Sequence, residues 1–208
     1  MSTKKESMTI LLIAVTALIS ILAFNNQVLF DRLKFSPYAI HHRKEVYRFA
    51  SYALVHAGWL HLLINMWVLY SFGSIVERTF KLHFGAGGMF YYFMLYVAGV
   101  LFSVLFDYGK FKNNVYYNAV GASGAVSAVV FSSILIYPAG SIYLFPIPFP
   151  IPSWLFGILY LVYSAYMQRK GTDNVGHSAH FWGAVFGMLF TVALLPDVLH
   201  NFFFQLGF

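Results

Sequence analysis

The sequence predicts an all-α membrane protein, a bundle of six transmembrane helices with a long interfacial first loop. Three observations lead to this expectation. Of the 208 residues, 60% are hydrophobic and only 10% are charged, whereas a soluble domain carries about 25% charged residues. The apolar residues gather into six runs, most of them long enough to cross a bilayer. The basic residues fall mainly between these runs, where a chain meets anionic lipid headgroups.

The first helix is predicted at 8–24, after a short polar segment. No convincing signal-peptide cleavage site follows it, so we interpret it as a retained helix. The connection over 25–55 interleaves basic and aromatic residues, which suits a segment lying among lipid headgroups. A structureless loop of this length would be unusual, so we expect it to be folded.

The other five helices follow from apolar runs that end at charged residues or at proline. They are predicted at 56–74, 89–105, 119–137, 153–167 and 178–195. Between the fourth and the fifth, prolines alternate with Ile and Phe from Pro146 to Pro152, which predicts an extended, stiff connection. The chain length suits one membrane domain, which we place over residues 1–208.

Composition excludes several functions. Cysteine is absent, which rules out thiol catalysis, disulfides and cysteine-based metal sites. The net charge is +6 and its basic residues are scattered, so we expect membrane lipids and not nucleic acid as their partners. A zinc protease would need an HExxH segment, which is absent. His56 and His61 are poorly spaced for one helix face, so no metal site is expected.

Polar side chains lie near the starts of the second, fourth and sixth helices. His61 and Asn65 are four residues apart and share a face, and His180 lies in the first turn of the sixth helix. Ser123 is expected about five residues inside the fourth, ~7–8 Å along its axis. Even-numbered helices start on one side of the membrane, so these side chains reach one depth. Ionisable groups at that depth are usually functional.

The segment Gly121-Ala122-Ser123-Gly124 favours a nucleophile. Small neighbours permit close approach, and a helix start offers free N–H groups to an oxyanion. His180 is the candidate base. Side-chain N–H groups of His61 and Asn65, with the Ser123 backbone N–H, are candidate oxyanion donors.

The acidic residues are expected at helix ends or in loops, so no carboxylate lies near Ser123 and His180, which favours a Ser–His dyad over a triad. An aspartyl intramembrane protease would need two aspartates in mid-helix, and none is expected there. They are Glu6, Asp31, Glu45, Glu77, Asp107, Asp173 and Asp197.

Two simpler interpretations fit some of the same residues. Gly124, Ala128 and Ser132 recur every four residues, as on any helix-packing face in a membrane protein. A small transporter or channel would use buried His and Asn side chains as a proton or solute path.

Gly183 and Gly187 lie on the face of His180 and predict a close approach of the sixth helix to the fourth.

Three segments resemble the motifs of the rhomboid intramembrane serine proteases. They are His56-Ala57-Gly58-Trp59-Leu60-His61-Leu62-Leu63-Ile64-Asn65, Gly121-Ala122-Ser123-Gly124, and Ala179-His180-Phe181-Trp182-Gly183-Ala184-Val185-Phe186-Gly187. They match the family's H-x4-H-x3-N, GxSG and AHxxGxxxG patterns in the family's order. The resemblance implies the compact six-helix rhomboid fold and cleavage of other proteins' transmembrane segments without a cofactor.

By resemblance, Ser123 is the nucleophile, His180 the base, and His61 and Asn65 the oxyanion donors. His56, Arg48 and Glu77 match positions that look structural. The alternative within the family is a proteolytically inactive protein that binds membrane clients. The resemblance also implies a multi-pass protein of the cell (inner) membrane. The resemblance implies a cytoplasmic N-terminus, whereas the positive-inside rule alone favours the reverse orientation. The basic residues of the first loop lie in the interface, where they mislead this count, so we follow the resemblance.

Two positions depart from the family pattern. Tyr47 precedes Arg48 where the family often has Trp-Arg. Ser127 stands four residues after Ser123, where many members place an aromatic ring that stacks on the catalytic histidine. Either Ser127 forms a hydrogen bond instead, or another ring, such as Phe131 or Phe181, takes that place.

Overall fold

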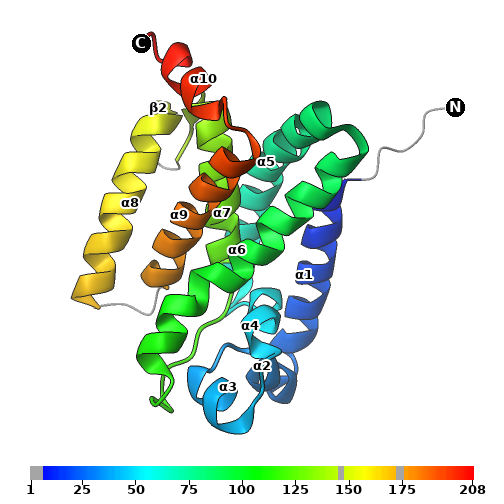
Figure 1. Ribbon diagram of the computed structural model, residues 1–208. Helices are drawn as coiled ribbons and strands as arrows, with labels where there is room; N and C mark the ends of the chain where they lie inside the picture. Colours follow the sequence, from blue (N-terminus) through cyan, green and yellow to red (C-terminus); the bar gives the residue numbers. More distant parts are fainter. Residues whose placement is uncertain (1–6, 145–147, 172–175) are drawn as a thin grey trace, which may run out of the picture.

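The computed structural model describes residues 7–144, 148–171 and 176–208, which form a helical bundle (Figure 1). In these ranges the long helices are α1 (Met8–Phe24), α5 (Trp59–Phe84), α6 (Gly88–Phe111), α7 (Ser123–Ile136), α8 (Ser153–Lys170) and α9 (His177–Leu194). The shorter elements are α2 (Gln27–Leu33), α3 (Pro37–Arg43), α4 (Arg48–Ser51), the 3₁₀ turns η1 (Tyr52–Leu54) and η2 (Gly85–Gly87), and α10 (Val198–Gln205).

The helix α7 forms the centre of the bundle. Every residue from Gly124 to Leu135 is buried, and the helix packs against α5, α6, α8 and α9, with α9 its most extensive neighbour. Its side chains are apolar or small on all sides, which is the pattern of a helix enclosed by others. In Figure 1, α1 and α8 flank the bundle on opposite sides.

Each predicted helix has a counterpart, but several boundaries differ. The second predicted helix starts at Trp59 and not at 56, and it continues to Phe84 and not 74. By length and hydropathy, two stretches of the described chain are able to cross a membrane: Trp59–Phe111, which contains α5 and α6, and His177–Leu194. The helices α1 and α7 are apolar but shorter. Fewer spans than the six expected therefore pass this test.

The proline-rich connection is only partly within the described residues, because 145–147, which include Pro146, lie outside them. Its end forms β2 (Ile151–Pro152), which pairs antiparallel with β1 (Ser141–Ile142). This short ladder is an exception to the all-α prediction.

The long first connection is folded into α2, α3, α4 and η1, at the end of the bundle where α1 ends (Figure 1). Arg48 is buried, and its Nη1 donates to the carbonyl oxygens of Asp31 and Lys34, both at 2.8 Å. The hydroxyl of Tyr52 donates to the carbonyl oxygen of Val100 on α6 at 2.7 Å. Bonds to backbone carbonyls therefore fix both the internal shape of this connection and its place on the bundle.

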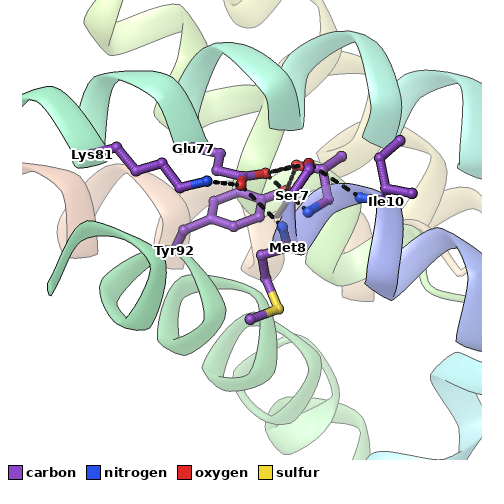
Figure 2. Close-up of polar contacts among 7 residues, drawn as sticks. Ser7, Met8, Ile10, Glu77, Lys81 and Tyr92 are labelled. Atoms are coloured by element: carbon purple, nitrogen blue, oxygen red, sulfur yellow. Dashed lines mark hydrogen bonds and ion pairs between the residues drawn. The ribbon is translucent and has the colours of Figure 1, made fainter. Parts of the chain in front are cut away.

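The carboxylate of Glu77, on α5, closes the start of α1 (Figure 2). It accepts hydrogen bonds from the backbone N–H groups of Met8 at 3.0 Å and Thr9 at 2.9 Å. The hydroxyls of Ser7 and Thr9 donate to it at 2.9 and 2.6 Å, and Lys81 pairs with it at 2.6 Å. A negative charge at a helix N-terminus is favourable because the N–H groups there lack acceptors. Glu77 therefore joins α1 to α5.

Candidate active site

Ser123 is the first residue of α7, so the prediction that it lies five residues inside a helix over 119–137 is wrong. The preceding segment is held by another part of the chain. Phe35 and Ala119 exchange both backbone hydrogen bonds, at 2.9 and 3.1 Å, and the N–H of Gly121 donates to the carbonyl oxygen of Tyr52 at 3.0 Å. Gly121 has a φ of +106°, which glycine adopts without strain. The chain turns there and α7 begins.

A cavity of about 1340 Å³ brings the four predicted side chains together. Ser123 contributes from α7, His180 from α9, and His61 and Asn65 from α5. Much of the remaining wall is apolar or aromatic and comes from α5, α7 and α8; it includes Trp67, Val68, Phe72, Val126, Val130 and Phe156. A polar cluster set in such a wall is a typical substrate site.

The amide of Asn65 is oriented by its own helix. Its Nδ2 donates to the carbonyl oxygen of His61 at 2.9 Å, which uses one of its two N–H groups. The ring of His61 lies against Gly121: a Cβ added at Gly121 would be 2.8 Å from Nε2 and 2.6 Å from Cε1 of that ring. Only a residue without a side chain lets His61 come so near to the backbone before Ser123.

His56 lies before α5, is fully buried, and makes hydrogen bonds with both ring nitrogens. Ser20 gives its hydroxyl proton to the carbonyl of Leu54 at 2.8 Å, so Nδ1 of His56 is the donor in its 2.9 Å bond to Ser20. Its Nε2 accepts from the backbone N–H of Ala122 at 3.4 Å. The rings of His56 and His61 meet at 4.9 Å, which their spacing on one helix would not allow. These bonds support the start of α7.

The helix α9 approaches α7 along its glycines. A Cβ added at Gly183 would overlap the carbonyl oxygen of Gly124, and one at Gly187 would overlap that of Ala128. On its other side Gly124 meets Ser103 of α6, whose Cβ would be 2.5 Å from an added Cβ. The backbones of α7 and α9 are therefore in direct contact, which sets the distance between the two helices that bear Ser123 and His180.

The ring that stacks on His180 comes from α8. Tyr160 lies with its ring centroid 6.1 Å from that of His180, and the two planes differ by 25°. The hydroxyls of Tyr160 and Ser127 share a hydrogen bond of 2.7 Å. The suggestion of Phe131 or Phe181 is wrong, because Phe131 packs on Tyr160, and Phe181 packs on its neighbour in α9. No sequence motif marks Tyr160, since its place depends on how α8 meets α7 and α9.

Two acidic residues contradict the expectation that all acids lie at helix ends or in loops. Glu77 lies within α5 and Asp107 within α6, and they are 4% and 2% exposed. Asp107 accepts a hydrogen bond of 2.7 Å from the hydroxyl of Tyr117. Neither is among the described residues that line the cavity, while Glu6 and Asp173 lie outside the described part of the chain. Among the described residues, no group of three or more His, Asp or Glu is arranged around a metal position.

The comparisons with known proteins agree on one family. Residues 43–197 match the family model described as "Rhomboid domain". The chain is 27% identical to Rhomboid protease GlpG of Haemophilus influenzae over 190 residues, which cover 89% of this chain and 90% of that protein.

Two longer proteins are also similar. RHOMBOID-like protein 12, mitochondrial, of Arabidopsis thaliana is 29% identical over 140 residues, 64% of this chain and 41% of that protein. Rhomboid-related protein 1 of Caenorhabditis elegans is 28% identical over 169 residues, 76% of this chain and 43% of that protein. The alignments thus cover less than half of the length of these two relatives.

Proposed function

The chain belongs to the rhomboid family, and on that premise we propose that it is an intramembrane serine endopeptidase that cleaves transmembrane segments of other membrane proteins. The observation that carries the proposal is that Ser123, His180, His61 and Asn65 line one cavity. Its apolar wall suits a substrate segment drawn from lipid. We further propose that residues 1–208 act as one membrane domain, and that no cofactor takes part.

The first step is acyl transfer to Ser123. Its Oγ attacks the carbonyl carbon of the scissile peptide bond while the His180 imidazole takes the hydroxyl proton. The carbonyl π electrons move to the oxygen and form a tetrahedral oxyanion. His180 then gives its proton to the amide nitrogen as the C–N bond breaks, so the amine product leaves neutral and an acyl ester of Ser123 remains.

The second step repeats the first with water. His180 takes a proton from water, whose oxygen attacks the ester carbon. When the C–O bond to Ser123 breaks, the serine oxygen regains its proton from His180. One water is consumed, one peptide bond is lost, and Ser123 and His180 return to their starting states.

The oxyanion needs donors in both steps, and three groups are available. The backbone N–H of Ser123 is at the start of α7, where N–H groups have no acceptor within the helix. The second N–H of the Asn65 amide is not used by the bond to His61. The third donor is Nε2–H of His61, whose ring lies beside Gly121. Donors already in place for the developing charge are a major source of rate acceleration.

We place the six long helices across the membrane and the segment from α2 to η1 at its surface. The aromatic and basic side chains of that segment suit the headgroup region. The membrane is the cell (inner) membrane or, by analogy with the Arabidopsis relative described as mitochondrial, a mitochondrial one.

The test is cleavage of a single-span substrate by the purified protein in liposomes. The parent should cut, and a serine-directed fluorophosphonate should label Ser123. Ser123→Ala and His180→Ala should each abolish cleavage while remaining folded, because nucleophile and base act as one unit. An inactive client-binding protein or a transporter predicts neither cleavage nor labelling of Ser123. Folded alanine variants that still cut would refute the dyad.

A further inference from the structure

Tyr160 occupies the place where α8 meets both α7 and α9. Its ring faces His180 with centroids 6.1 Å apart, within the usual range for offset ring pairs. Its hydroxyl shares the 2.7 Å hydrogen bond with Ser127, which is only 3% exposed. Both residues line the cavity that holds Ser123. One ring is therefore in contact with the base on one helix and bonded to the helix of the nucleophile on another.

The surroundings leave this ring little freedom. Phe131 of α7 lies 5.6 Å from it and Phe156 of α8 lies 5.7 Å from it, centroid to centroid. Ser127 follows Ser123 by about one helical turn and shares its face. The hydrogen bond therefore joins the ring of Tyr160 to the face of α7 that presents the nucleophile. Its hydroxyl is engaged by Ser127, and its ring is the part of Tyr160 that lies beside His180.

We propose that Tyr160 is a positioning residue: its ring holds the imidazole of His180 in the orientation that reaches Ser123, and Ser127 anchors the ring. This inference rests on the proposed function, since it requires His180 to be the base. The imidazole sits at the start of α9, where the Tyr160 ring stacks on it and the His177 ring lies nearly perpendicular to it, with centroids 6.0 Å apart and an interplanar angle of 80°. Removing the Tyr160 ring opens the space into which the imidazole can turn.

The first experiment replaces the ring. Tyr160→Leu should lower kcat by on the order of 10–10²-fold, the effect of an ångström-scale misplacement, with KM near the parental value. The rate of fluorophosphonate labelling of Ser123, measured on folded protein, should fall by a similar factor. This probe is small and does not need the contacts that recognise a transmembrane segment. Tyr166→Leu is the matched control on the same helix, since Tyr166 is 59% exposed, and it should label and cut like the parent.

The second experiment removes only the anchor. Tyr160→Phe and Ser127→Ala each delete the same hydrogen bond and should each slow labelling about fivefold, the value of one net hydrogen bond. The double variant should be no slower than the slower single variant, because both changes act on one interaction. This cycle also decides the matter if Tyr160→Leu does not fold.

The possible results are distinct. Parental labelling by folded Tyr160→Leu, or a rise in KM alone, would overturn the inference and make Tyr160 a substrate contact or a packing residue. If the losses of labelling rate in Tyr160→Phe and Ser127→Ala multiply in the double variant, the two changes act independently and the anchoring role is overturned. A parent protein that neither cuts nor labels would instead overturn the proposed function, and this inference with it.

Discussion

Replacing Gly187 by valine should weaken both stability and proteolysis, although Gly187 carries no catalytic atom. A Cβ at this position would lie 2.6 Å from the Cα and 2.7 Å from the carbonyl carbon of Ala128, and it would overlap the carbonyl oxygen. Carbon atoms in good contact are ~3.5–4.0 Å apart, so α9 must move away from α7 by roughly 1 Å. His180 lies about two turns earlier on the same helix and moves with it.

The expected loss of folding stability is the difference between two opposing contributions. Overpacking costs typically ~1–3 kcal/mol, and valine belongs at the upper end because its Cβ already overlaps backbone. The higher helix propensity of valine compared with glycine offsets less than about 0.5 kcal/mol of this cost. The net loss of roughly 2.5 kcal/mol corresponds to a fall in Tm of about 5–10 °C for a chain of this size. A displacement of ~1 Å between base and nucleophile costs on the order of 10² in rate.

The assay is thermal unfolding in detergent together with the initial rate of cleavage well below Tm. Gly109→Val, on α6, is the matched control, because no heavy atom lies within 4 Å of a Cβ added there. It should keep the parental Tm and rate. If Gly187→Val also behaves like the parent, the close packing of α7 and α9 does not hold His180 in place, and the reasoning is refuted while the dyad is untouched.

Asn65→Ala should lower kcat by ~10²–10³ with little change in KM, since one of the proposed oxyanion donors is lost and the others remain; parental kcat would exclude Asn65 from the oxyanion site. Gly121→Ala should slow fluorophosphonate labelling of Ser123, because the new Cβ strains a backbone with φ of +106° and meets the His61 ring; unchanged labelling would mean that this ring has no part in the reaction. Glu77→Ala should lower stability by about 1–3 kcal/mol, because the buried N–H of Thr9 and the partly buried N–H of Met8 lose their acceptor. Glu77→Gln should lose less, and both variants should cut normally below their Tm; a parental Tm for Glu77→Ala would contradict the capping role.

Local patterns in the sequence determined the helical class and the approximate place of each long helix. Apolar runs and the polar residues or prolines between them are read within a few turns, so they predict helices without knowledge of the fold. The parity of the helices also placed His61, Asn65, Ser123 and His180 at one level, and in the structure these four line one cavity. The alternation of helix direction is enough to predict which helix ends lie together.

The start of α7 was decided only by the tertiary structure. Residues 119–122 continue an apolar run, and nothing local separates them from the helix. The backbone groups of Ala119 and Gly121 instead bond to Phe35 and Tyr52, which lie more than sixty residues earlier in the chain. Such pairing overrides local helix preference, and it brings Ser123 to the first position of the helix.

The partner of His180 was decided in the same way. The sequence shows that position 127 is a serine, but it does not show which helix fills the space beside it. Tyr160 takes that place because α8 packs across α7 and α9, which also brings its hydroxyl within hydrogen-bonding distance of Ser127. Contacts between separate helices depend on their packing angles and distances, and these follow from the whole set of side chains at the interfaces and not from any repeat within one helix.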